Sequence, residues 1–387
     1  MLKLGGKVAR IDAVDVSDKP HLFRVSTRDL PGALRKDRAY LVGPENIPDG
    51  YVHYLVPQAH ESRVEEFTEI GAYTVLPPEY FYLGHDDVIR LSADRTSIRV
   101  LFRASSNHNS ILMTEQCNHY CLMCSQPPKS ADDSWLLNEI EELLPLIPRD
   151  TAEIGFTGGE PTLSGDRFIR IMGLTKSYLP RTAVHVLSNG RSFANLDFAK
   201  KYAAIQHPDI MVGIPIYSDD PTLHDYIVQA KGAFDETLRG ILNLKMLGQK
   251  VEIRIVLHKQ SIPRLTELCE FIGRNLLFVD HVALMGLEMM GFTRANLDVL
   301  WVDPHDYRDT LSEAVGILSR YRMNVSIYNH QLCLVNDDVQ PFYRKSISDW
   351  KNEYAPECAT CSKRDGCGGF FSSGVKFGYS SKLVPFL

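Results

Sequence analysis

The stretch CNHYCLMC, residues 117–124, carries three cysteines, Cys117, Cys121 and Cys124, at spacings of four and three. An odd number of cysteines does not form a complete set of disulfides, and a closed zinc site uses four ligands. Three thiolates on one loop suit a [4Fe–4S] cluster that keeps one iron open, because full cysteine ligation of such a cluster takes four. The alternative is a structural zinc ion whose fourth ligand is His119 or a distant cysteine.

Length and composition place the chain among ordinary globular proteins. It has 387 residues, 44% of them hydrophobic and 23% charged, and a net charge of −6. This supports one large domain or two to three smaller ones, and it argues against nucleic-acid binding by the chain as a whole. The first residues lack the apolar segment of a secretory signal, and no apolar run reaches the length of a membrane span. We therefore expect a cytoplasmic protein with no nucleic-acid or membrane partner.

Strand-like and helix-like segments alternate between residues 106 and 292. Such alternation predicts βαβ units and a parallel sheet with right-handed crossovers. The predicted fold class is α/β, with a partial (β/α)6 barrel in this central part. The expected strands are 111–115, 152–163, 183–190, 209–217, 251–259 and 279–291, and the expected helices are 133–147, 232–248 and 262–273.

The two flanking regions differ from this pattern. Residues 1–105 carry short apolar runs broken by Pro, Gly and Asp, and VIRLSADRTSIRVLF (88–102) reads as two strands around a polar turn. We interpret 1–105 as a β-rich N-terminal domain or extension. Residues 293–387 contain a helix at 303–322, a strand at 323–330 and a loop-rich remainder with four cysteines. This C-terminal module is too small to bury much of a core, so we expect an additional stabilising link there.

Several chemistry-bearing residues follow expected strands directly. In parallel α/β folds, ligands gather at the carboxyl ends of the strands. The cysteine loop, the turn GGEP (158–161), Ser188-Asn189 and Tyr217-Ser218 all stand at such ends. We therefore expect them at one mouth of the barrel.

The three-cysteine loop after a strand, followed by GGEP, resembles the radical S-adenosylmethionine (radical SAM) superfamily over residues 108–290. The resemblance implies that Cys117, Cys121 and Cys124 hold a [4Fe–4S] cluster. Its open iron would bind the amino and carboxylate groups of SAM, and one electron from the cluster would then cleave SAM to methionine and a 5′-deoxyadenosyl radical. The sequence departs from the family at Met123, where an aromatic residue near the adenine is usual.

The resemblance also implies a set of SAM-binding residues, each with a structural alternative. Glu160 in GGEP would take the SAM amino group, although GGEP also reads as a plain turn. Arg254 is a candidate for the SAM carboxylate or a core salt bridge, and Met285 for adenine contact or core packing. Ser188 and Asn189 are candidates for the ribose or carboxylate, or for an Asx turn with the next glycine. The full candidate set is Gly158, Gly159, Glu160, Pro161, Ser188, Asn189, Ser218, Arg254 and Met285.

A second group of cysteines lies near the C-terminus. CATCSKRDGCGG gives Cys358, Cys361 and Cys367, and Cys333 lies upstream. The run resembles the auxiliary-cluster extensions called SPASM or twitch domains, although the position of a further cysteine of the full pattern is Phe371. This implies at most one auxiliary [4Fe–4S] cluster, with zinc as the alternative and the role of Cys333 open. The remaining cysteine, Cys269, has helical spacing and is interpreted as a core residue.

The chain resembles the radical SAM maturases of the His-Xaa-Ser peptide-modification system in three stretches, CNHYCLMCSQPPK, YNHQLC and CGGFFSSG. This implies a peptide or small-protein substrate bearing His-Xaa-Ser repeats, a partner maturase and an electron donor. Two other functions stay open: a radical SAM enzyme acting on a small molecule or cofactor precursor, and a non-enzymatic zinc or iron–sulfur interaction or sensor protein. No acid or base is assigned, since His119, Tyr120 and His224 are all residues of a kind that is often structural.

Overall fold

In the computed structural model, residues 3–8, 10–12, 21–66, 72–92, 96–345 and 352–387 are described. The chain divides into two compact units. One comprises residues 1–111 with 138–154 and 174–182, and the other comprises 112–137, 155–173 and 183–387. The domain boundaries at 105/106 and 292/293 stay a prediction.

The first unit contains an eight-stranded mixed sheet in the order β1-β8-β7-β3-β4-β5-β6-β2. The expected hairpin in 88–102 is present, since β7 and β8 pair antiparallel. β1 and β2 occupy opposite edges of the sheet although only two residues separate them in sequence. The strands are β1 Gly5–Lys7, β2 Arg10–Asp12, β3 His21–Ser26, β4 Arg38–Leu41, β5 His53–Pro57, β6 Ala72–Leu76, β7 Val88–Leu91 and β8 Ser97–Phe102.

Both faces of this sheet carry an apolar cluster. The members of each cluster alternate along the strands, as the period of two in a strand requires. One cluster includes Phe23, Leu55 and Ile89, and the other includes the tyrosines Tyr54 and Tyr73. The second cluster is carried by β4, β5 and β6, so these three strands are apolar on both faces.

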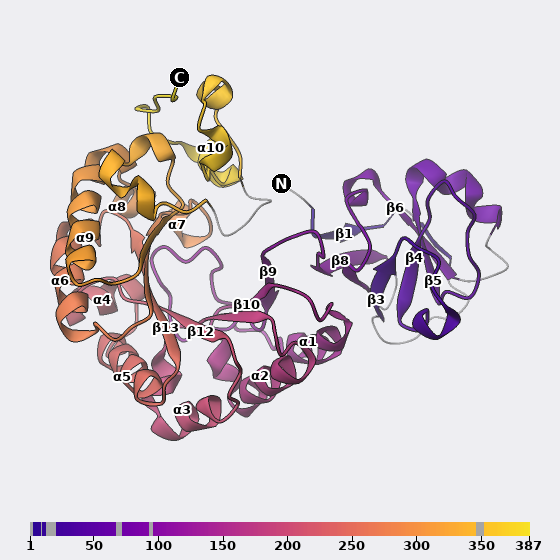
Figure 1. Cartoon of the computed structure of the whole chain (residues 1–387), viewed down its shortest axis with the longest axis horizontal. Helices are drawn as coiled ribbons and strands as arrows, with labels where there is room; N and C mark the ends of the chain where they lie inside the picture. Colours follow the sequence, from indigo (N-terminus) through magenta and orange to yellow (C-terminus); the bar gives the residue numbers. More distant parts are fainter. Residues whose placement is uncertain (1–2, 9, 13–20, 67–71, 93–95, 346–351) are drawn as a thin grey trace. The chain divides into compact units, whose positions relative to one another are not determined.

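The second sheet has seven strands in strict chain order, from β9 to β15. Strands β11 to β15 pair parallel to their neighbours, and helices line the outer side of the sheet (Figure 1). The strands are β9 Asn109–Leu112, β10 Glu153–Thr157, β11 Ala183–Leu187, β12 Ile210–Pro215, β13 Lys250–Leu257, β14 His281–Gly286 and β15 Val325–Tyr328. The helices are α1 Trp135–Leu143, α2 Asp166–Tyr178, α3 Leu196–Ala203, α4 Pro221–Val228, α5 Ala233–Met246, α6 Leu265–Asn275, α7 Phe292–Ala295, α8 Leu297–Leu300, α9 Arg308–Arg320 and α10 Ser372–Phe377.

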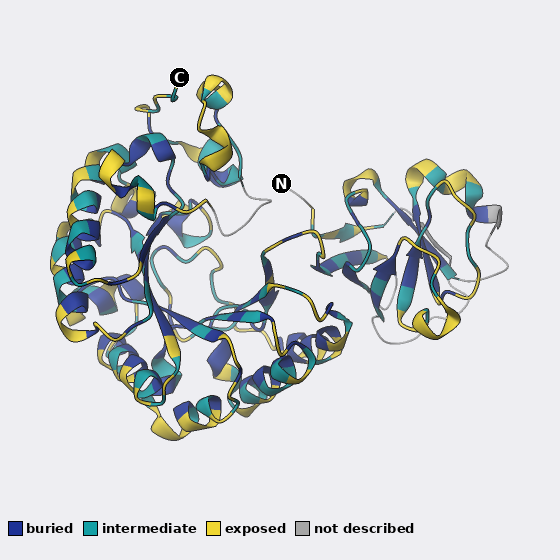
Figure 2. Ribbon diagram, in the orientation of Figure 1, coloured by how far each residue is buried: buried dark blue, intermediate teal, exposed yellow. Residues whose placement is uncertain are grey.

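The sheet thus confirms a parallel α/β architecture but extends the predicted six strands by one. The additional strand, β15, pairs with β14 from Val282↔Val325 to Met285↔Tyr328. We predicted this strand but placed it in the C-terminal module, because the repeat of strand and helix becomes irregular after residue 292. The strands are buried and the outer faces of the helices are exposed (Figure 2).

Other expectations are confirmed at the level of individual elements. The helices expected at 133–147, 232–248, 262–273 and 303–322 correspond to α1, α5, α6 and α9. Cys269 is fully buried on α6, as a core residue should be. Among the described residues, none of the helices combines the length and the apolar character that a bilayer span requires.

Candidate functional site

The cysteine loop leaves β9 and is held in place along its backbone. Its carbonyl and amide groups bond to α4 and to the segment around α7, both distant in sequence. These bonds run from Tyr120 N–H to Val228 O (3.1 Å), from Leu122 N–H to Ile227 O (2.9 Å), from Phe292 N–H to Cys124 O (2.8 Å), from Thr293 Oγ1 to Met123 O (3.0 Å) and from Asn296 Nδ2 to Leu122 O (2.9 Å). Backbone groups of a buried loop must be paired, and these bonds fix the direction in which the cysteines point.

The three cysteines line a solvent-open cavity. All three are partly exposed. Burial raises the pKa of the Cys117 thiol to about 11, and it also raises the pKa of the Cys121 and Cys124 thiols. Three neighbouring thiolates in such a place need a positively charged group to balance them, and iron–sulfur clusters and zinc both provide one.

The glycines of GGEP permit a close approach to the start of the cysteine loop. Gly159 N–H donates to Thr114 O and Glu160 N–H donates to Gln116 O, both at 2.8 Å. A side chain at Gly158 or Gly159 would collide with the carbonyl oxygens of Thr114 and Gln116. The turn after β10 is therefore packed directly against the loop, which requires glycine at both positions.

The Glu160 carboxylate is fully buried and accepts four hydrogen bonds. Its Oε1 accepts from Ser188 Oγ at 2.8 Å and from Thr162 Oγ1 at 2.5 Å and Thr162 N–H at 3.0 Å, and its Oε2 accepts from Asn189 N–H at 2.5 Å. Burial raises the pKa of this carboxyl, and the four hydrogen bonds oppose the shift. A carboxylate has about four acceptor positions, so the side chain is engaged in joining the ends of β10 and β11.

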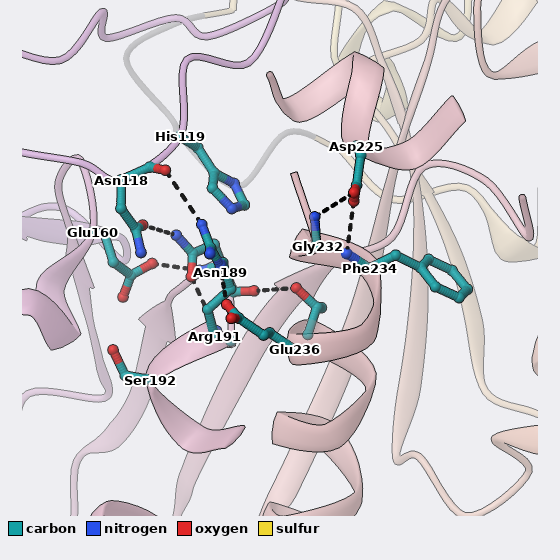
Figure 3. A network of polar contacts seen from close by, with 12 residues as sticks. Asn118, His119, Glu160, Asn189, Arg191, Ser192, Asp225, Gly232, Phe234 and Glu236 are labelled. Atoms are coloured by element: carbon teal, nitrogen blue, oxygen red, sulfur yellow. Dashed lines mark hydrogen bonds and ion pairs between the residues drawn. The ribbon is translucent and has the colours of Figure 1, made fainter. Parts of the chain in front are cut away.

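A second set of contacts joins the cysteine loop to the end of β11 (Figure 3). Asn189 Nδ2 donates to Asn118 Oδ1 at 2.6 Å, and Arg191 Nη1 donates to Asn118 O at 3.4 Å. Arg191 is in turn held by Glu236 of α5 at 2.6 Å. The Asn118–Asn189 pair thus connects the residue after the first cysteine to a candidate SAM-binding residue.

Arg254, on β13, lines the same cavity and forms a core salt bridge, one of the two roles that its sequence position predicted. Its Nη1 lies 3.2 Å from Glu252 Oε1, so a buried salt bridge exists. Its Nη2 lies 3.0 Å from Met285 Sδ, and both residues line the cavity. The guanidinium still faces the cavity with unused N–H donors, since it has five in total.

Glu252 is the centre of a polar layer that crosses the sheet beneath the cavity. His281 Nδ1 lies 2.6 Å from Glu252 Oε2, and His185 Nε2 lies 3.4 Å from its Oε1. Burial would raise the pKa of Glu252, but hydrogen bonds from His185 and His281 and the charge of Arg254 hold it well below its usual range. Sequence reasoning missed this layer, although the alternation of Glu252 and Arg254 within the apolar run VEIRIV signals two side chains on one face of a strand.

The structure brings together most of the predicted site. The cavity is lined by Cys117, Cys121, Cys124, Gly158, Gly159, Ser188, Asn189, Arg254 and Met285. Met123 lines it as well and packs against Tyr217. Glu160, Pro161 and Ser218 are instead buried within the fold, and the Ser218 hydroxyl accepts from Asp220 N–H at 3.0 Å just before α4. Their predicted contacts with SAM stay predictions.

The four C-terminal cysteines also share a cavity. Cys333, Cys358, Cys361 and Cys367 line it together with Leu332, Leu383, Pro385 and Phe386. The Cys367 sulfur accepts from Leu332 N–H and Gly369 N–H, both at 3.4 Å. Such N–H donors are typical around cluster sulfurs, so the residues fit an iron–sulfur cluster, and four thiolates also fit zinc.

No three His, Cys, Asp or Glu side chains within the described ranges converge closely enough to hold a single metal ion. The assignment of the seven cysteines as ligands therefore rests on their shared cavities and stays a prediction.

Comparison with known proteins gives a family match over the central part of the chain. The sequence model of the family described as "Radical SAM superfamily" matches residues 111–272. An Fe-coproporphyrin III synthase from Methanosarcina barkeri is 31% identical over 176 residues, which are 41% of this chain and 39% of that protein. A probable GTP 3′,8-cyclase from Methanocella arvoryzae is 24% identical over 195 residues, 46% of this chain and 61% of that protein. The matches thus span less than two thirds of either relative.

The fold is shared with a solved structure described as native anSMEcpe with bound AdoMet. That likeness has a TM-score of 0.50 and 14% sequence identity, and it covers 72% of this chain and 92% of the other. At this identity the comparison concerns the fold alone.

Proposed function

We propose that the protein reductively cleaves SAM at a [4Fe–4S] cluster and modifies a peptide or small protein. The proposal rests on the match of residues 111–272 to the sequence model of the radical SAM superfamily. Cys117, Cys121 and Cys124 would hold that cluster. Cys358, Cys361 and Cys367, with Cys333, would hold an auxiliary cluster or a zinc ion. The finer assignment, a maturase of the His-Xaa-Ser type with a partner maturase and an electron donor, rests on the sequence resemblance.

One observation carries the proposal: a single cavity is lined by the three cysteines, the glycine pair, Ser188-Asn189 and Arg254. A cluster bound there would supply one-electron reduction of SAM, which yields methionine and a 5′-deoxyadenosyl radical. Hydrogen abstraction from an unactivated carbon is the work that such cofactors do.

The residues of the chain have separate tasks in this scheme. Arg254 is placed to bind the SAM carboxylate with the guanidinium nitrogens that do not face Glu252. The glycine turn brings backbone groups to the cavity, and Asn189 lines it with a side-chain amide that Asn118 holds in place. Glu160 positions Ser188 and Asn189 by the hydrogen bonds described above, so we assign it a positioning role.

The experiment is SAM cleavage by anaerobically purified, reduced protein, measured as 5′-deoxyadenosine. We expect product from the wild type and none from Cys121→Ala. Cys269→Ala is the matched control, because it makes the same substitution in a cysteine buried on α6. Absence of 5′-deoxyadenosine from iron-loaded wild type, with or without peptide, would refute the proposal.

A second candidate is a radical SAM enzyme that acts on a small molecule. The names of the two relatives favour it, since one concerns a porphyrin and the other a nucleotide. The test is whether a His-Xaa-Ser peptide or the small-molecule fraction of a cell extract increases 5′-deoxyadenosine formation above the substrate-free rate. A sensor protein without catalysis is the third alternative, and it predicts no SAM cleavage at all.

A further inference from the structure

The cavity at the cysteine loop adjoins two further cavities, and we call the three together the passage. The middle cavity shares the lining residues Gly286, Leu287 and Asn329 with the cavity at the cysteines. The outer cavity shares Met289, Trp301, Val302, Gly378 and Tyr379 with the middle one. One wall comes from the rim of the seven-stranded sheet and the other from the C-terminal segment.

Two buried polar atoms in the middle cavity have no hydrogen-bond partner within the part of the chain that the structure describes. They are Asn329 Oδ1 and Ser373 Oγ, and Ser373 is only 9% exposed. Asn329 also holds a left-handed backbone, with a φ of 58°. Buried polar groups are normally paired, so these two, which belong to residues lining one cavity, indicate a ligand with its own donors and acceptors.

The outer cavity has an acidic and aromatic lining. Asp298, Asp303 and Asp306 contribute three carboxylates, against a single ammonium from Lys259. The Asp306 side chain is 67% exposed, whereas Asp303 caps the turn at His305. Trp301 and Tyr379 provide aromatic surface beside these carboxylates. A cationic side chain would find both charge complementarity and aromatic faces there.

We propose that this passage binds an extended, cationic segment of the polypeptide substrate. Asn329 and Ser373 would bond its backbone amides in the middle cavity, and a lysine, arginine or protonated histidine would lie among the outer carboxylates. The residue to be modified would then reach the cavity at the cysteines. This inference rests on the proposed function, because it names the substrate class of that site.

An extended peptide fits the observations better than a compact metabolite. The passage is a series of neighbouring cavities, and its two unpartnered atoms are an amide oxygen and a hydroxyl, which suit backbone N–H and C=O groups. Three carboxylates would repel nucleic acid and acidic peptides at the outer end.

The test is fluorescence anisotropy with two labelled probes, a short peptide of alternating glycine and lysine and its glutamate counterpart. The protein is the full chain, purified anaerobically with its metal content intact. We expect Asp298→Asn/Asp306→Asn to weaken binding of the lysine probe about three- to tenfold, because each removes one partly exposed charge contact. Asp166→Asn/Asp197→Asn, which neutralises two exposed carboxylates on α2 and α3, is the matched control and should leave the affinity unchanged.

A second variant tests the middle cavity independently of charge. Asn329→Gly keeps the left-handed backbone accessible but removes the amide, and we expect a few-fold loss of affinity for the lysine probe without loss of folding. Three results would overturn the inference. They are an equal loss of affinity in the control variant, unchanged affinity in both Asp298→Asn/Asp306→Asn and Asn329→Gly, and preference for the glutamate probe.

The same preparations, assayed for 5′-deoxyadenosine without peptide, separate the two proposals. SAM cleavage with no selective binding of the lysine probe refutes the passage alone. Selective binding with no SAM cleavage refutes the proposed function and leaves the passage as a peptide-binding site.

Discussion

The two groups of cysteines in this chain occupy different kinds of site. The loop group has three cysteines at a large, solvent-open cavity that apolar side chains line together with the polar residues Arg254, Ser188 and Asn189. The C-terminal group has four cysteines around a much smaller space that leucines, a proline and a phenylalanine help to close. An open coordination position is useful only where a ligand can reach it, so we assign chemistry to the first site and electron relay or structural support to the second.

The largest effect expected concerns the cysteines themselves. The triple substitution Cys117→Ala/Cys121→Ala/Cys124→Ala should remove about four irons of about eight and abolish 5′-deoxyadenosine formation. Cys358→Ala/Cys361→Ala/Cys367→Ala should remove the other four irons, or one zinc, and leave SAM cleavage without substrate measurable. Iron, sulfide and zinc analysis with the nucleoside assay checks both. Zinc without iron in the wild type would contradict the assignment of the first site.

The next effect concerns the carboxylate that organises the open site. In the wild type, four donors bond the Glu160 carboxylate. Glu160→Gln replaces one carboxylate oxygen by an NH₂ group, so some of these buried donors lose their acceptor. We expect this to lower the free energy of unfolding by about 3 kcal/mol. Urea unfolding of the full chain measures the change. Glu313→Gln, on the exposed face of α9, is the control and should change stability by less than about 0.5 kcal/mol. Equal stability of the two variants would mean that the hydrogen bonds of Glu160 are not structural.

Buried histidines beneath the open site predict a pH effect. Burial lowers the pKa of His224 and of His258 from 6.5 to about 4 in the folded state. Unfolded chains take up these protons first as the pH falls, so the stabilisation is complete above pH 6.5 and is lost progressively towards pH 4. Each histidine accounts for about 1.4 kcal/mol per pH unit in that window.

Urea unfolding at a series of pH values measures this slope. The Nδ1 of His258 accepts from Gln260 N–H, and an asparagine oxygen can take that bond without titrating. His258→Asn should therefore reduce the slope of unfolding free energy against pH by the contribution of one titrating histidine. An unchanged slope in both His258→Asn and His224→Asn would contradict the prediction.

The smallest effect expected concerns the attachment of the cysteine loop. Asn118→Ala removes the bond to Asn189, worth about 1 kcal/mol, so the loop should open more often. A chelator should then strip the irons of the loop a few-fold faster and those of the C-terminal group at the wild-type rate. Asn243→Ala is the control, since its amide bonds to Phe193 O and Ala194 O outside the loop. Faster loss from both sites would indicate a general loosening instead.

Much of the central architecture follows from local patterns. The strands could be located because each is a short apolar run that ends at a turn or a polar pair, and the common mouth follows from the parallel arrangement. The open-site residues could be named because CNHYCLMC and GGEP are specific motifs. β15 was assigned to another module because two short helices, α7 and α8, stand between β14 and the long helix α9 and interrupt the regular alternation of strand and helix.

The hydrogen-bond partners could not be predicted in the same way. Whether Glu160 faces a ligand or the ends of β10 and β11 depends on which strand ends meet, and that is decided by packing over the whole sheet. The same holds for Glu252, whose partners come from β11 and β14 through the register Glu252↔His281. Asn118 and Asn189 are 71 positions apart, and nothing in either local sequence indicates their pairing.

The N-terminal sheet has a consequence for the handling of this protein. β1 ends at residue 7 and β2 begins at residue 10, so a chain of this length brings the two opposite edges of the sheet within about 11 Å of each other. β1 and β2 therefore pair with the outer backbone groups of β8 and β6, respectively. Truncation of residues 1–12 would leave β8 and β6 with unpaired backbone N–H and C=O groups, to which a strand of a second chain could bind. Precipitation of such a truncated protein would then reflect exposed strand edges rather than damage to the cysteine sites.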